Sequence, residues 1–85
     1  MDNDIALKAV LEKLKQFGGN KILLLVSLLN KHSWLTYQNQ SEKATEIYEQ
    51  IYLLQCLICE DVLMDYGYVY DESGSYPLWN KNVSY

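Results

Sequence analysis

The sequence predicts one small, mainly α-helical domain: a three-helix bundle with a long third helix, followed by a short C-terminal β-hairpin or an extended aromatic tail. Three observations predict this fold. Apolar residues recur at helical spacing over much of the chain. A length of 85 residues is enough for one hydrophobic core but not for two. Neither Gly nor Pro occurs between Asn20 and Tyr66, whereas β-prone tyrosines and turn residues follow Gly67.

The first helix is expected over residues 3–17. Apolar side chains recur there every three or four positions, while Lys8, Glu12 and Lys15 take the opposite face. Gly18-Gly19 should end the helix, because glycine adopts the left-handed conformation that follows many helices without a steric clash.

The second helix is expected over residues 20–31, with Asn20 as its N-cap. The segment is apolar nearly all round, so it should be the most enclosed element. A buried strand is the alternative, but most of its apolar residues are not β-branched, which favours a helix. Turn-prone residues then predict a connection before residue 41, from which Trp34 and Leu35 should fold back onto the core.

The third helix is expected over residues 41–65, with a main apolar stripe that faces the core. Leu53, Leu57 and Met64 fall on roughly the opposite side of this helix. One bundle core cannot cover both stripes, so either the tail or a second copy of the chain must cover the second one. We expect a two-fold homodimer that buries Leu53, Leu57 and Met64.

Residues 66–85 form the tail. Tyr68-Val69-Tyr70 is β-prone, and Asp71-Glu72-Ser73-Gly74 is typical of a turn. Tyr76-Pro77-Leu78-Trp79 could return as an edge strand. Its proline weakens the case for a strand, so both the hairpin and the extended tail remain open.

Cys56-Leu57-Ile58-Cys59 is the one motif with a familiar chemistry. A structural zinc site needs four ligands, and the chain offers two cysteines and one histidine, His32. A redox-active pair needs a helix N-terminus to stabilise the thiolate, whereas this pair is expected in mid-helix before Glu60 and Asp61. We therefore expect both cysteines in the core and His32 near the last carbonyls of the second helix. No catalytic site, metal or cofactor is predicted, and the protein is not expected to be an enzyme.

The N-terminus is acidic, and the most apolar run, residues 22–29, is shorter than the roughly 20 residues of a membrane span. With only two cysteines, these features predict a cytoplasmic protein that does not contact membranes. The chain contains no arginine and carries a net charge of −4, which argues against direct binding of nucleic acid.

Charge is distributed unevenly along the chain. Residues 1–43 carry six lysines and four acids, a local charge of +2, whereas residues 44–85 carry one lysine and seven acids, a local charge of −6. Carboxylates steer an encounter with a basic surface, and tyrosines supply rigid contact area. A solvated helix end with tyrosines over the core is the alternative. The residues expected to bind a basic partner are Glu60, Asp61, Asp65, Tyr66, Tyr68, Tyr70, Asp71, Glu72 and Tyr76.

The segment from Asp65-Tyr66 to Tyr76-Pro77 is similar to the acidic, tyrosine-bearing recognition segment of nuclease-toxin immunity proteins. The chain as a whole resembles the short, acidic, tyrosine-rich proteins of phages and other mobile elements. These resemblances imply a stoichiometric inhibitor, of the anti-defence or immunity type, that blocks a basic, nucleic-acid-handling surface of a larger protein. The alternatives are a winged-helix-like transcriptional regulator, with residues 68–79 as the wing, and a structural helical subunit.

Overall fold

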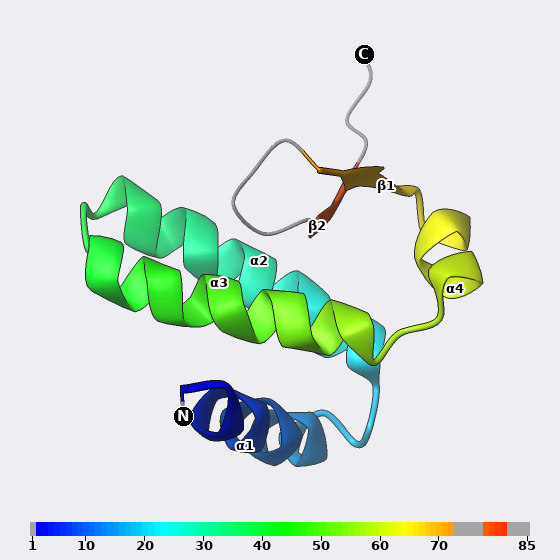
Figure 1. Ribbon diagram of the computed structural model, residues 1–85, viewed down its shortest axis with the longest axis horizontal. Coiled ribbons are helices and arrows are strands. Elements are labelled where there is room, and N and C mark those ends of the chain that lie inside the picture. Colours follow the sequence, from blue (N-terminus) through cyan, green and yellow to red (C-terminus); the bar gives the residue numbers. More distant parts are fainter. Residues whose placement is uncertain (1, 73–77, 82–85) are drawn as a thin grey trace.

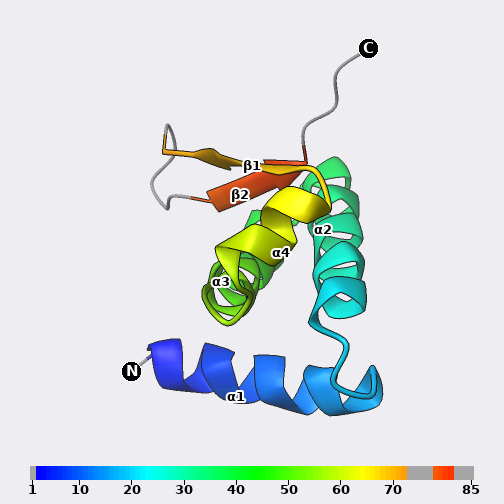
Figure 2. The same cartoon turned by 90° about the vertical axis from the view of Figure 1, so that its right-hand side faces the viewer.

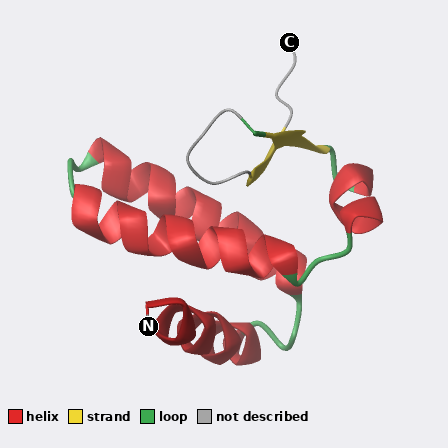
Figure 3. Ribbon diagram, viewed as in Figure 1, coloured by secondary structure: helices red, strands yellow, loops and turns green. Residues whose placement is uncertain are grey.

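The protein is described by a computed structural model that covers residues 2–72 and 78–81. These residues form four helices and one two-stranded antiparallel sheet (Figures 1 and 3). The mainly helical class and the C-terminal hairpin are confirmed, and the extended tail is wrong. The elements are α1 (Asp2–Gln16), α2 (Lys21–Tyr37), α3 (Ser41–Cys56), α4 (Glu60–Asp65), β1 (Tyr68–Asp71) and β2 (Leu78–Lys81).

The centre of the fold is the antiparallel pair of α2 and α3. Helix α1 packs mainly on α3, on one side of this pair, and the hairpin lies on the other side (Figures 1 and 2). The short helix α4 leads from the end of α3 to β1. Every element contributes to one hydrophobic core, whose burial is the main stabilising term. The core residues are Val10, Leu24, Leu25, Leu28, Leu35, Ala44, Ile47, Ile51, Leu54, Ile58, Leu63, Tyr68 and Leu78.

Helix α1 and its end follow the sequence pattern closely. The helix covers Asp2–Gln16, one residue from the expected range. Gly18 and Gly19 both have positive φ, at 62° and 81°, and the N–H of Gly19 donates to the carbonyl of Leu14 at 3.0 Å. Asn20 caps the next helix as expected, because its Oδ1 accepts from the N–H of Leu23 at 3.1 Å.

Helix α2 runs to Tyr37, so the expected end at residue 31 is wrong. The connection to α3 is residues 38–40, where Asn39 takes a left-handed φ of 59°. Leu35 is buried as expected, but it lies within the helix, and Trp34 is 60% exposed rather than folded onto the core. Helix α2 is also not the most enclosed element. Apolar residues lie on two sides of this helix, and the neighbouring elements cover only one of the two sides.

The single third helix over 41–65 is wrong. Helix α3 ends at Cys56, and the N–H groups of Leu57 and Ile58 bond to carbonyls three residues back, which tightens the last turn. Cys59 is then extended, with φ −63° and ψ 138°, before α4 begins. This bend turns the chain back over α3, so that Ile58 and Leu63 both reach the core. Among the described residues, none of the helices has the length and apolar character that crossing a membrane requires.

Candidate protein-binding face

A buried polar side chain of α3, Gln55, hydrogen-bonds to the hairpin. Its Nε2 donates to the carbonyl of Trp79 at 2.7 Å, and its Oε1 accepts from the N–H of Trp79 at 2.8 Å. The N–H and C=O of a strand residue point to the same side, so Trp79 directs both away from β1. Gln55 thereby occupies the outer edge of β2, as a further strand would. This amide fixes the position of the residues that the hairpin presents.

The two strands pair in a register that sets Tyr70 opposite Trp79. Because the N–H and C=O of Trp79 point outward, the two residues form a non-hydrogen-bonded pair, in which side chains are closest. Their ring centroids lie 5.3 Å apart with the planes tilted by 56°. Tyr70 is 46% exposed, so this aromatic pair has one side on the surface.

Tyr68 does not belong to the surface. It is 4% exposed and lies in the hydrophobic core, where burial raises the pKa of its hydroxyl. Tyr68 is therefore a core residue here and not part of an exposed binding surface, since a partner cannot reach most of its ring. Tyr66, in contrast, is 52% exposed. Tyr76 lies outside the described residues.

The acidic residues of α4 and of the end of β1 are all exposed. Glu60 and Asp61 occupy the first turn of α4, where the helix dipole favours negative charge. Partial desolvation, followed by the charge of Glu72 and by that of Glu60 among others, raises the pKa of the Tyr70 hydroxyl. Glu60 in α4 and Glu72, which follows β1, therefore both contribute to raising this pKa. Asp71 is also tied into the hairpin, since the Nδ2 of Asn80 donates to its Oδ2 at 3.4 Å.

A shallow hollow of about 430 Å³ lies between α4 and the hairpin. Met64 and Val69, which the sequence did not suggest for partner binding, are 59% and 49% exposed beside it. The signal for Val69 was available, because it alternates with two tyrosines on a β-prone segment. The residues that line the hollow are Met64, Gly67, Tyr68, Val69, Tyr70 and Trp79. We call the exposed part of this region the acidic face: Glu60, Asp61, Met64, Asp65, Tyr66, Val69, Tyr70, Asp71 and Glu72.

The three residues of the expected dimer stripe do not lie on one helix. Leu53 lies in α3 and is partly buried, Leu57 follows the end of α3, and Met64 lies in α4. The stripe is expected for an unbroken helix, whereas the structure divides its members between α3, the bend at residues 57–59 and α4. Met64 instead belongs to the acidic face.

The two cysteines are exposed and free, so the expectation that they lie in the core is wrong. Cys56 is the last residue of α3 and Cys59 precedes α4, so neither is in mid-helix. Nowhere in residues 2–72 and 78–81 do three or more His, Cys, Asp or Glu side chains come together as a metal-binding group.

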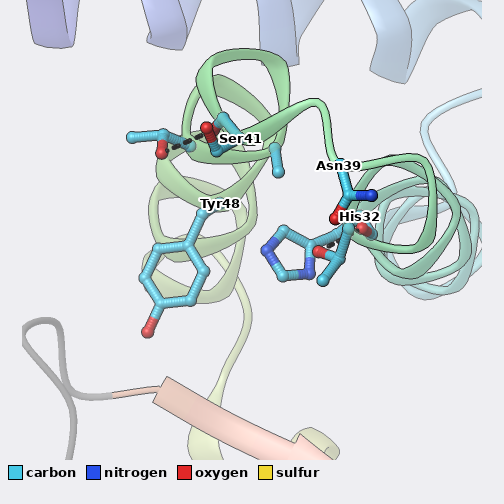
Figure 4. Close-up of a pocket in the computed structure, with 7 residues that line it drawn as sticks. His32, Asn39, Ser41 and Tyr48 are labelled. Carbon is cyan, nitrogen blue, oxygen red and sulfur yellow. Dashed lines mark hydrogen bonds between the residues drawn. The ribbon is translucent and has the colours of Figure 1, made fainter.

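A second cavity, of about 610 Å³, opens at the loop end of the α2–α3 pair (Figure 4). The rings of His32 and Tyr48 face each other there with centroids 5.6 Å apart. His32 therefore packs against α3 in the body of α2, not at its last carbonyls as expected. Thr36 and Thr45, which also line the cavity, donate their hydroxyl protons to carbonyls one turn back, at 2.9 Å each. Of the described residues that line it, none has a carboxylate that could orient His32 as a base.

The lysines of the N-terminal half do not form a ready anion site around Lys13. Its Nζ donates to the Oε1 of Gln50 at 2.6 Å and so joins α1 to α3. Burial, and then the charge of Lys31, lower the pKa of Lys13. The acidic face is thus the better candidate for binding through charge. The chain matches no protein-family model, no curated protein and no solved structure.

Proposed function

We propose that this protein is a non-enzymatic binding module that holds a basic surface of a larger protein against its acidic face. The observation that carries the proposal is the half-exposed Tyr70 beside an apolar hollow, with exposed carboxylates on α4 and at the end of β1. Helices α1, α2 and α3 act as a three-helix scaffold, and Gln55 fixes the hairpin to it.

The hollow suits the side chain of a lysine or arginine. Such a side chain lays its aliphatic stem on apolar surface while its charged head stays near carboxylates or water. Met64 and Val69 offer that apolar surface, and the pair of Tyr70 and Trp79 offers aromatic rings to a cation. Carboxylates nearby then attract the head group. The fit is to a basic protein and not to nucleic acid, whose phosphates the same carboxylates would repel.

We further propose that the partner's basic surface is one that handles nucleic acid, and that the protein blocks it one-to-one in the cytoplasm. Residues 44–85 carry a local charge of −6, so they can take the place of phosphates on such a surface. This is the inhibitor of anti-defence or immunity type that the sequence resemblance implies. A winged-helix role is less well supported, because Asp71 and Glu72 at the end of β1 are acidic and exposed.

The proposal is tested by exchanging charge on the acidic face and, as a matched control, on α3. Glu60→Lys with Glu72→Lys should abolish capture of the partner in affinity purification, whereas Glu42→Lys with Glu46→Lys should retain it. Both pairs are exposed and change the net charge equally. Association should slow mainly at low salt, because steering is screened at high salt. The captured protein should be basic, and one equivalent of wild-type chain should release its nucleic acid.

Two results would refute the proposal. Equal capture by both charge variants, in folded proteins, would show that the acidic face is only solvated surface. Tyr70→Ala should also speed dissociation by a factor that corresponds to roughly 1–3 kcal/mol, whereas Tyr70→Phe should retain most of the lifetime. If Tyr70→Ala leaves the dissociation rate unchanged, the ring pair is not part of the contact.

A further inference from the structure

Helix α2 has a second apolar side that the core does not use. Leu23, Val26, Trp34 and Tyr37 are 54%, 44%, 60% and 79% exposed. With 100° of rotation per residue, these four and Asn30 lie within an arc of about 80°, opposite the leucines that α2 buries. We call these five residues the α2 stripe.

Helix α2 lies at the margin of the molecule (Figure 2). Helix α3 lies on one side of α2, and within residues 2–72 and 78–81 no helix or strand lies on the opposite side. The rings of Trp34 and Tyr37 touch each other, with centroids 6.4 Å apart, but both stay largely on the surface. Two adjacent exposed aromatic residues on the same helix face as exposed aliphatic ones are typical of an interaction surface, where such rings supply most of the binding energy.

We infer that the α2 stripe binds the same stripe of a second copy, with the two helices antiparallel about a two-fold axis at Asn30. The spacing of the residues carries this choice of partner. Leu23 and Tyr37 are each seven positions from Asn30, and Val26 and Trp34 are each four positions from it. An antiparallel pair centred on Asn30 therefore sets each aliphatic residue of one copy opposite an aromatic residue of the other.

Asn30 suits the position on the axis. A primary amide has both donors and an acceptor, so two identical amides related by a two-fold axis can bond to each other reciprocally. A lone asparagine within an apolar helix seam also fixes the register of the two helices. The flanking serines obey the same symmetry, since Ser27 and Ser33 are each three positions from Asn30.

The surface available matches a small but specific dimer. Aromatic side chains bury about 150–250 Å² each, so the exposed parts of Trp34 and Tyr37 from two copies offer roughly 600 Å². Leu23 and Val26 raise the total to roughly 1,000 Å², the lower limit for a specific interface. The stripe belongs to α2 alone, so the dimer and the binding of a basic partner through the acidic face are independent of each other.

The oligomeric state tests the proposal through matched substitutions. Sedimentation over a wide micromolar range should show wild-type protein approaching twice its 9.9 kDa chain mass. Trp34→Glu should raise the dissociation constant of the dimer about tenfold or more, whereas Met64→Glu should leave this constant unchanged. These two side chains are 60% and 59% exposed, so the pair compares equal exposures on different surfaces. Circular dichroism should show that both variants keep their helices.

Asn30→Asp places two carboxylates on the axis. The dissociation constant of the dimer should rise about tenfold or more at neutral pH. It should return toward the wild-type value as the pH falls below about 4, where the carboxyl groups are protonated. A wild-type monomer at all concentrations would overturn the proposal, as would a dimer that Met64→Glu disrupts and Trp34→Glu does not. Unchanged association of Asn30→Asp at neutral pH would overturn the placement of the axis.

Disulfide trapping tests the register. With Cys56→Ser and Cys59→Ser as background, Asn30→Cys should cross-link to itself on mild oxidation. Leu23→Cys should not, because an antiparallel pair separates the two Leu23 positions by about 21 Å along the helix, whereas a disulfide needs Cα atoms within about 7 Å. A mixture of Leu23→Cys and Tyr37→Cys should cross-link. Self-linking of Leu23→Cys without linking of the mixture would show parallel helices and refute the pairing.

Discussion

Replacing Gln55 by methionine tests whether one amide holds the hairpin on α3. Methionine is about as long as glutamine, but it offers no comparable donor or acceptor to the backbone of Trp79. Gln55 is 5% exposed and makes both hydrogen bonds at short distance. Each bond is worth about 0.5–1.5 kcal/mol net, and a buried backbone group without a partner costs about 1–3 kcal/mol. Since Trp79 is only partly buried, we expect docking of the hairpin to weaken by about 2–3 kcal/mol.

Two probes in urea separate loss of the hairpin from loss of the helices. In a Trp34→Phe background, Trp79 is the single tryptophan, so its fluorescence reports on the hairpin. Far-ultraviolet circular dichroism reports mainly on the helices. In the methionine variant the fluorescence transition should move to lower urea by about 1–2 M, ahead of the helical transition. If the fluorescence midpoint does not move, Gln55 does not hold the hairpin and the reasoning is refuted.

Gln55→Glu makes the same contact depend on pH. A protonated carboxyl group keeps one donor for the carbonyl of Trp79 and one acceptor for its N–H, whereas an ionised group has no donor. The folded state therefore favours the protonated form and raises the pKa of this glutamate above its unfolded value of about 4.3. Its stabilising contribution is complete below that value and is lost as the pH rises through the folded pKa. The stability difference from wild type, measured at each pH, should thus grow from acid to neutral conditions.

Three other predictions concern single features of the fold. Gly19→Ala should lower the free energy of unfolding by about 1–2 kcal/mol in urea titration, because φ is +81° at this position. No atom lies within 4 Å of the added Cβ, so the cost comes from backbone strain and not from a clash. Cys56 and Cys59 should both react with iodoacetamide in the folded protein as fast as in urea, since both are exposed, and strong protection of either would contradict their placement. Because the pKa of Tyr68 is raised, its neutral form stabilises the fold below the ordinary pKa of about 10 and this contribution is lost as the pH rises beyond it. Tyrosinate absorbance should then show that Tyr68→Phe removes a component that titrates above pH 10.

The helix starts and the first loop could be predicted because local chemistry decides them. Gly18-Gly19 and Asn20 act within one turn of the backbone, so the end of α1 and the start of α2 follow from the sequence. The end of α2 could not be found in this way. Its loop uses Asn39 in a left-handed conformation, whereas the equally polar Asn30 lies inside the helix. Local propensity does not separate these two asparagines, because packing of α2 on α3 decides which one ends the helix.

The bend before α4 and the role of Gln55 depend on contacts between distant parts of the chain. None of Leu57, Ile58 and Cys59 is a turn-forming residue. The helix ends there because the bend lets both Ile58 and Leu63 pack in the core. Gln55 gave a weak signal, as a polar residue beside the buried Leu54. Its partner is backbone 24 residues away, and side-chain periodicity contains no information about such a bond. The acidic and aromatic composition of the candidate face was predictable, and so was the possibility that its tyrosines cover the core, but not that Tyr68 is the buried one.

The edge of β2 has a consequence for aggregation. Unpaired N–H and C=O groups on an edge strand are a template on which other chains add strands, and a two-stranded sheet has two such edges. Gln55 covers the outward-facing groups of Trp79, and α3 lies behind them, so these groups are not open to strand addition. The outer edge of β1 remains, next to Asp71 and Glu72, whose charges repel an identical chain. Fibril growth from the native hairpin is thus opposed at one edge by an amide and at the other by electrostatics.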